Sequence, residues 1–198
     1  MLYQLAQGAA DPGHDAGIRE LAALSARLAY AMMCLTLCWG ILTSLGWVNR
    51  ITGRQAVRNG HMMLATLTLA FAGVHGVAFL LLRNNPWTLT QLLMPFHPGG
   101  QLRYTMGILA FEGMLAAAVA IGLKRWMTYR RWLGIHRLTY PAFMLGVGHA
   151  FLAAMANGSL ATLWLAGITL LVPAVTLAII RFVPAKALAT TGLLEDVP

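Results

Sequence analysis

Residues 61–82 read HMMLATLTLAFAGVHGVAFLLL, 22 consecutive residues without a Lys, Arg, Asp or Glu. The hydrocarbon core of a bilayer is about 30 Å thick, and an α-helix needs about 20 apolar residues to cross it. Because lipid offers no hydrogen-bond partner to backbone groups, a segment at that depth is expected to be helical. This stretch therefore predicts a transmembrane helix, and it carries two histidines, His61 and His75.

Four further stretches have the same apolar character. They are residues 28–48, with a first turn from Leu21; 104–123, interrupted only by Glu112; 138–155, extended backwards through His136; and 159–180, which contains Pro173. None shows the alternating segments of about ten residues that are typical of a transmembrane barrel. We therefore expect an all-α fold, a polytopic membrane bundle of about five transmembrane helices.

Composition supports a membrane protein. Of the 198 residues 59% are hydrophobic and only 10% are charged, whereas soluble domains carry about 25% charged residues. This excludes a soluble enzyme, a disordered chain and a nucleic-acid-binding domain. The two cysteines, Cys34 and Cys38, are too few for a disulfide scaffold or a multi-cysteine zinc site, and we expect both to be small buried residues.

The basic residues predict the orientation of the chain. With five spans, ten of them share one side (Arg50, Arg54, Arg58, Lys124, Arg125, Arg130, Arg131, Arg137, Arg181 and Lys186) and four lie on the other (Arg19, Arg27, Arg83 and Arg103). Cytoplasmic loops are richer in Lys and Arg, so we expect a multi-pass protein of the bacterial inner membrane with its N-terminus outside and its C-terminus inside. Residues 1–20 would form an extracytoplasmic segment, 21–183 the bundle and 184–198 a cytoplasmic tail. Trp47, Trp87, Trp126 and Trp132 fall near span ends, as interfacial anchors do.

Four histidines divide into two levels of the bundle. The second and fourth predicted spans run in the same direction, so His61 and His136 lie near their cytoplasmic ends, and His75 and His149 lie nearer the outer leaflet. At about 1.5 Å rise per residue the two levels are about 20 Å apart. A zinc site needs about four ligands at one point, whereas two pairs at different depths are the arrangement that two bis-histidine haems require.

The two histidines on one span are expected to share a helical face, whereas those on the other span are not. The step of 14 positions from His61 to His75 returns a helix to within about 40° of its starting direction. The step of 13 positions from His136 to His149 leaves a discrepancy of about 140°, although Pro141 lies between them and proline commonly kinks a helix. Gly73, Gly76, Gly146 and Gly148 flank His75 and His149, where they allow either a porphyrin edge or a neighbouring helix to approach.

The segment 132–140, WLGIHRLTY, resembles the Leu-His-Arg-Leu-x-Tyr stretch of the ferric-reductase-like transmembrane domain superfamily. This superfamily includes ferric reductases, the membrane part of NADPH oxidases and the haem subunit of the periplasmic methionine sulfoxide reductase system. The histidine spacing is also similar, over roughly residues 50–181. The resemblance implies a cytochrome b with two b-type haems, the cytoplasmic-side one ligated by His61 and His136 and the outer one by His75 and His149. It also implies that the spacing of 13 is accommodated and that electrons flow outward.

The chain departs from this superfamily in two respects. It has five expected spans rather than six, and no flavin- or nicotinamide-binding domain or Gly-rich fingerprint follows the last span. We therefore expect an oxidoreductase electron-transfer subunit without its own NAD(P)H domain. A separate cytoplasmic flavoprotein, a ferredoxin-like protein or the quinol pool would reduce it. The alternatives are a quinone-coupled, haem-bearing anchor subunit of a larger oxidoreductase and a non-redox membrane protein.

Several polar residues are candidates for contacts with these groups. Haem propionates are anionic and pair well with Arg, so the candidates are Arg58 and Arg137, with Arg54 and Arg131, at the inner haem and Arg27 and Arg103, with Arg83, at the outer one. The insertion bias explains the cytoplasmic arginines equally well. Glu112 is either a proton acceptor or part of a quinone pocket, or else a protonated side chain hydrogen-bonded between helices. His97 belongs to an external loop that is expected to hold a short helix around residues 88–94, and it is either part of an acceptor or metal site or a simple loop residue.

Overall fold

The computed structural model describes residues 12–45, 53–84, 86–162 and 167–183, and these ranges contain helices and no strand. Four helices are long and apolar enough to cross a membrane, and a shorter apolar helix covers Thr169–Ile180. The prediction of an all-α, polytopic membrane bundle is therefore confirmed. The helices are α2 (Pro12–Leu45), α4 (Arg54–Ala78) with the 3-10 turn η1 (Phe79–Leu81), α5 (Leu89–Leu93), α6 (Leu102–Gly122), the 3-10 turn η2 (Lys124–Trp126), α7 (Tyr129–Arg137), α8 (Thr139–Ala156), the π-helical turn η3 (Gly167–Leu171) and α10 (Val172–Phe182).

The fifth predicted span, 159–180, corresponds to η3 and α10, while residues 163–166 lie outside the described part of the chain. Pro173 stands in the first turn of α10, where a helix has no intrahelical acceptor for the missing amide.

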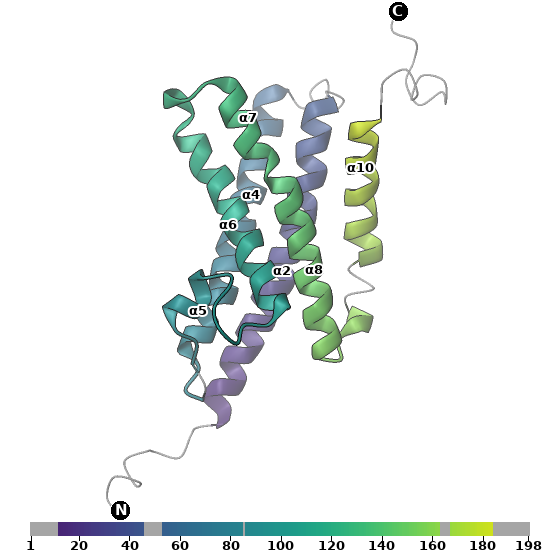
Figure 1. Ribbon diagram of the computed structural model, residues 1–198. Coiled ribbons are helices and arrows are strands. Elements are labelled where there is room, and N and C mark those ends of the chain that lie inside the picture. Colours follow the sequence, from purple (N-terminus) through teal and green to yellow (C-terminus); the bar gives the residue numbers. More distant parts are fainter. Residues whose placement is uncertain (1–11, 46–52, 85, 163–166, 184–198) are drawn as a thin grey trace, which may run out of the picture.

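The helices alternate in direction through the bundle. In Figure 1, α4 and the successive helices α7 and α8 run one way, and α2, α6 and α10 run the other way. One end of the bundle, called the α7 end here, therefore carries η2, α7 and the start of α4, and the opposite α5 end carries α5 and the start of α2. The predicted parallel direction of the second and fourth spans is confirmed.

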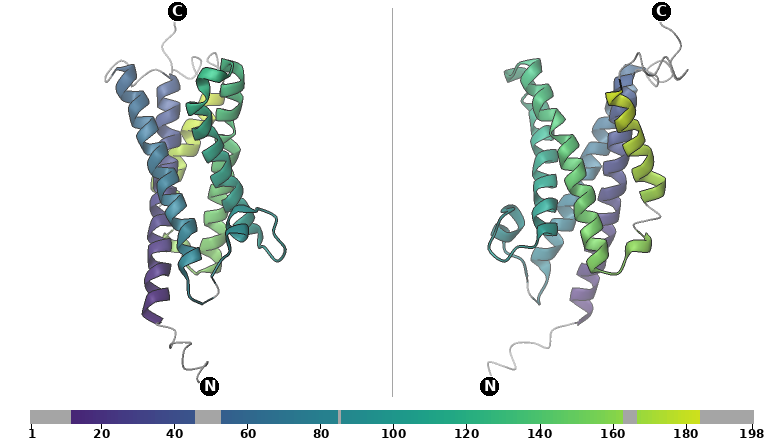
Figure 2. Two further views of the ribbon diagram at one scale, coloured as in Figure 1. Left: turned by 90° about the vertical axis from the view of Figure 1, so that its left-hand side faces the viewer. Right: turned by 45° about the vertical axis from the view of Figure 1, so that its right-hand side comes forward.

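The long helices pack as two pairs. α2 lies mainly along α4, and α6 lies mainly along α8, while α10 covers α2 (Figure 2). Buried side chains from α2, α8 and α10 form the apolar core, among them Tyr30, Met33, Phe143 and Ala174. Cys34 belongs to this core and is fully buried, and both cysteines are free thiols, as expected.

α2 is longer than predicted, because it begins at Pro12 rather than near Leu21. Its 34 residues make a helix about 50 Å long, more than a bilayer core of about 30 Å requires. Contacts at the α5 end account for the extra turns. The Asp15 carboxylate accepts hydrogen bonds from Arg83 N at 2.9 Å and from Asn84 N at 3.0 Å, and a third from the Asn84 side chain at 2.9 Å. The polar residues that made residues 12–20 unlike a span thus attach this helix to the segment after η1.

The fourth predicted span is interrupted at Leu138. α7 ends at Arg137 and α8 begins at Thr139. Pro141 has no amide hydrogen to donate to the carbonyl four residues earlier, and this weakens the helical ladder there. At the junction, Leu138 N donates to Ile135 O at 3.0 Å, three residues earlier rather than four. The distortion that Pro141 was expected to introduce is therefore present between His136 and His149.

The short helix expected around residues 88–94 is α5. Thr88 caps it by accepting from Gln91 N at 3.2 Å, and the Gln91 side chain accepts from Thr88 N at 2.9 Å. This reciprocal capping box begins the helix at the residue that the sequence indicated.

Candidate functional site: two facing histidine pairs

His75 on α4 and His149 on α8 face each other near the α5 end of the bundle. Their ring centres are 6.1 Å apart, and the ring planes are inclined by 68°. His75 Nδ1 bonds to Ala22 O at 2.9 Å, and His149 Nδ1 bonds to Arg103 O at 2.6 Å. A carbonyl only accepts, so each Nδ1 carries the proton and Nε2 is the nitrogen with a lone pair for a metal.

His61 on α4 and His136 on α7 form the second pair, nearer the α7 end. Their ring centres are also 6.1 Å apart, with the planes inclined by 74°. Here both Nδ1 atoms are buried without a hydrogen-bond partner of good geometry. The structure therefore brings together the same two pairs that depth along the spans indicated.

Both pairs fit a metal ion held between two imidazoles. A metal–nitrogen bond of about 2 Å on each side separates the ring centres by about 6 Å, which agrees with the two values of 6.1 Å. Within the described ranges no three His, Cys, Asp or Glu side chains converge on one point. Each pair thus offers two imidazoles, one from each half of the bundle, which would suit an iron whose other four ligands belong to a porphyrin. The roles of His61, His75, His136 and His149 as haem ligands stay predictions.

Two glycines that sequence reasoning missed make room for the rings. A Cβ at Gly40 of α2 would lie 2.9 Å from His61 Cε1, and a Cβ at Gly107 of α6 would lie 2.7 Å from His149 Nδ1. Each glycine belongs to the helix packed along the one that carries its histidine. No pattern in the sequence links Gly107 to His149, because the contact depends on how α6 packs along α8.

The glycines that the sequence did single out have a different role on α8. A Cβ at Gly146 would meet the Met33 sulfur at 3.0 Å, and one at Gly148 would meet the end of Met106. These two residues serve close packing between helices, one of the two interpretations their sequence allowed. Gly73, by contrast, has open space where its Cβ would be.

Aromatic side chains surround both pairs. Trp132, one helical turn before His136, stacks on its ring with centres 5.4 Å apart and planes inclined by only 8°. Phe79 lies edge-on to His75 at 5.2 Å, and it is followed by Trp87 at 5.5 Å. Trp126 is exposed, as a membrane anchor would be, whereas Trp132 and Trp87 pack against the bundle; Trp47 lies outside the described residues. The spacing of four between Trp132 and His136 was a signal for their contact.

Of the seven arginines predicted to bind propionates, Arg103 is best placed. It is half-buried, and its Nε is buried without a partner, while its terminal nitrogen donates to Tyr104 OH at 2.7 Å. Its own carbonyl accepts from His149, so it adjoins the outer pair. Arg27, Arg58 and Arg137 are exposed, and their role stays a prediction.

Two other candidate residues, Glu112 and His97, lie apart from the histidine pairs in the sequence and make few polar contacts. Glu112 is half-buried in α6 and makes no hydrogen bond or ion pair with another described residue, so nothing supports the expectation that it bonds between helices. His97 lies in the loop between α5 and α6, with its ring 6.3 Å from that of Trp87 and its Nε2 buried without a partner.

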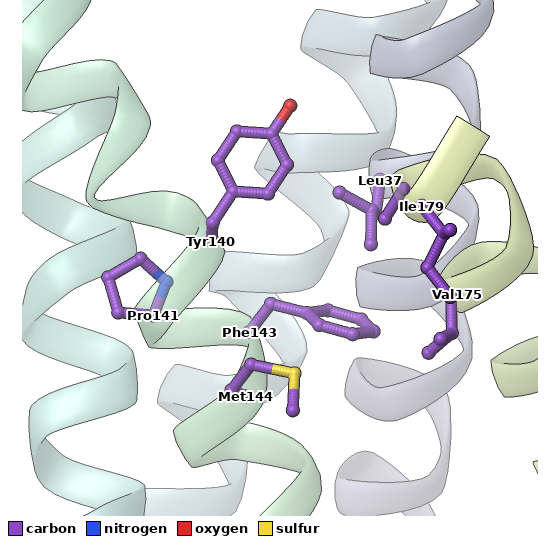
Figure 3. A pocket seen from close by; sticks show the side chains of 8 residues that line it. Leu37, Tyr140, Pro141, Phe143, Met144, Val175 and Ile179 are labelled. Atoms are coloured by element: carbon purple, nitrogen blue, oxygen red, sulfur yellow. The ribbon is translucent and has the colours of Figure 1, made fainter. Parts of the chain in front are cut away.

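An apolar groove of about 320 Å³ opens between α8, α2 and α10. Figure 3 shows Tyr140 and Phe143 of α8 facing Leu37 of α2 and Val175 and Ile179 of α10. Tyr140 follows His136 by four residues in the sequence, but neither histidine of the inner pair lines the groove.

Comparison with known proteins identifies the bundle. The family model described as ferric reductase like transmembrane component matches residues 25–147. This range contains His61, His75 and His136, and His149 follows two residues after its end. No curated protein and no solved structure matches the chain.

Proposed function

Since this chain belongs to the family of ferric reductase like transmembrane components and spans the membrane several times, we propose that it is a b-type dihaem cytochrome that relays electrons across the bilayer. The donor would be a separate cytoplasmic protein, and the acceptor would lie outside the membrane. Family membership supports a membrane oxidoreductase domain, and the paired histidines support the finer assignment.

The observation that carries the proposal is the repetition of one geometry at two levels. Each pair takes one histidine from the α2–α4 half of the bundle and one from the α6–α8 half, and each has the same ring separation of 6.1 Å. A histidine inside a span is costly and is normally retained for a function. Four of them, matched in two pairs, are poorly explained by packing alone.

Haem iron supplies one-electron redox chemistry when it is bound. The histidines would hold it, and the protein fixes their direction. In the outer pair, donation from Nδ1 to the carbonyls of Ala22 and Arg103 fixes the orientation of each ring and directs Nε2 away from those carbonyls. The unpartnered Nε of Arg103 is positioned to pair with an anionic propionate, and the apolar helices keep water away.

The charge distribution supports the proposed orientation of the chain in the membrane. Exposed Lys124, Arg125, Arg130 and Arg131 lie at the α7 end, which would face the cytoplasm of a bacterial inner membrane and would leave the C-terminus inside. A soluble donor such as a flavoprotein or a ferredoxin-like protein would meet this end. The outer pair, the loop with His97 and the extracytoplasmic acceptor would then share the α5 end.

The groove beside Tyr140 favours a second candidate, a quinone-coupled anchor subunit. Its lining is apolar, and Tyr140 in that lining follows His136 by four residues, so it would suit a quinone that reduces the protein from within the membrane. Reduction of the purified protein by a quinol analogue, together with a co-purifying catalytic subunit, would favour this alternative.

The decisive experiment is a dithionite-reduced minus oxidised spectrum of the purified protein, with haem counted against protein. The proposal expects a b-type spectrum and two haems per chain. Protein that is folded and helical but free of haem after expression with ample haem would point instead to a non-redox membrane protein.

A further inference from the structure

Three side chains form a column that leads from the α7 end to the inner histidine pair. Lys124 Nζ lies over the Trp132 ring, 4.5 Å from its centre. The same indole stacks on His136, with centres 5.4 Å apart and planes inclined by 8°. Trp132 Nε1 is buried and has no hydrogen-bond partner. Contacts of its ring with Lys124, with His136 and with Tyr129 (ring centres 5.6 Å apart), rather than a hydrogen bond, therefore determine where the indole lies.

The outer pair also has a cation over an aromatic ring, since Arg103 lies over Tyr104 at 4.7 Å, but among the described residues that ring contacts Trp87 and not a histidine. His149 and His75 are held by backbone carbonyls, and such bonds make an imidazole a stronger electron donor to a metal. His136 Nδ1 has no such bond, and it has a stacked indole with a cation over it instead. The two levels of the bundle therefore surround their histidines with different electrostatics.

A fixed positive charge near a metal centre disfavours its more oxidised, more positive state. Because Lys124 is exposed, solvent and salt screen its charge, so the effect on the inner site is expected to be largest at low ionic strength. Second-shell groups and burial are the means by which a protein adjusts the potential of a haem. Lys124, ordered over Trp132, keeps its charge at a defined place relative to His136.

We propose that Lys124 and Trp132 are positioning residues that raise the midpoint potential of the inner site. The inner site would then be reduced more readily than it would be without them. This inference rests on the proposed function, because it presupposes a haem between His61 and His136. It adds an assignment for two residues that are not expected to ligate the iron.

Arg125 provides a matched control within the same turn. Its guanidinium also lies over an indole, that of Trp126, at 3.9 Å. Trp126 is 66% exposed and has no ring contact with a histidine among the described residues. Lys124→Gln and Arg125→Gln thus remove one positive charge each from adjacent positions, and only the first removes it from the column.

The experiment is a spectroelectrochemical titration of the full-length, haem-loaded protein in lipid nanodiscs at low salt. We expect Lys124→Gln to lower the midpoint potential of one of the two haems and Arg125→Gln to shift neither. In Trp132→Phe protein, Lys124→Gln should still lower that midpoint potential. Trp132→Leu alone should lower the same potential, and adding Lys124→Gln to it should cause no further shift. In His75→Ala protein, the remaining haem should show the Lys124 shift, and higher salt should diminish it.

Equal shifts in Lys124→Gln and Arg125→Gln would overturn the inference, because they would indicate a general effect of surface charge. So would the absence of any shift, or a shift that is confined to the haem lost in His75→Ala. If Trp132→Leu does not fold, the comparison of Lys124 with Arg125 still decides. Wild-type protein without haem would contradict the proposed function itself, whereas two haems with unshifted potentials would contradict this inference alone.

Discussion

Gly107 of α6 lies directly against the imidazole of His149, so that a Cβ at position 107 would come within 2.7 Å of Nδ1. That nitrogen donates to the carbonyl of Arg103, one turn earlier on the same helix. One turn of α6 thus supplies both the space and the hydrogen bond that orient the histidine. Gly40 on α2 provides the corresponding space for His61 on α4.

Gly107→Ala should displace His149 and remove about one haem per chain, since atoms that close must move apart. Gly40→Ala should do the same at the inner level. The measurement is the haem-to-protein ratio with reduced-minus-oxidised spectra. Gly122→Ala is the control on α6, because its Cβ would meet nothing within 4 Å. Two haems in Gly107→Ala protein would show that the ring position does not depend on this glycine.

His75→Ala should remove about one haem and leave the spectrum of the inner one intact, because His61 and His136 lie in a separate pair. The readout is the pyridine haemochrome ratio before and after substitution. His97→Ala, which alters a loop histidine at the same end, should keep both haems. Retention of both haems in the His75 variant would refute the pairing.

Asp15→Ala should lower the unfolding temperature of the protein, because it leaves the backbone amides of Arg83 and Asn84 without their acceptor. Three hydrogen bonds from Arg83 and Asn84 are lost. Thermal unfolding in detergent, followed by circular dichroism, measures the change. Glu20→Ala, at an exposed position on the same helix, should leave the unfolding temperature unchanged. An equal effect of both substitutions would mean that this attachment contributes little.

Reversing the charge at Arg130 and Arg131 to Glu should slow reduction by an acidic soluble donor about tenfold at low salt, because electrostatic steering raises association rates. The difference should shrink as ionic strength rises. Stopped-flow reduction of the haems measures it, and Arg19→Glu at the α5 end is the control. An unchanged rate and salt response would argue for electrons arriving from quinol.

The fold was largely predictable because its determinants are local. Uncharged runs of about 20 residues identified the long helices, and the length of the loop between two spans indicated the short one, whose capping box the structure then shows. The start of α2 was missed, because residues 12–20 contain Asp15, Arg19 and Glu20, which look unlike a span. Their place in a helix depends on a contact with residues 83 and 84, far away in the sequence.

The site was predictable in part. Depth along parallel helices was enough to match His61 with His136 and His75 with His149. Ideal helical geometry could not orient His136 and His149 on one face, because it does not include the interruption at Leu138. The carbonyls of Ala22 and Arg103, like Gly107, carry no sequence signal for their role. They contact histidines only through the packing of helices that are distant along the chain.

The division of the bundle into an α2–α4 half and an α6–α8 half has a consequence for biogenesis. Each half brings only one imidazole to either level. A cofactor ligated by both halves would therefore add a second link between them, beside the apolar core that α2, α8 and α10 form. Chains made under haem starvation would then depend on this core alone to hold the halves together, and we expect them to be more sensitive to protease than haem-loaded chains.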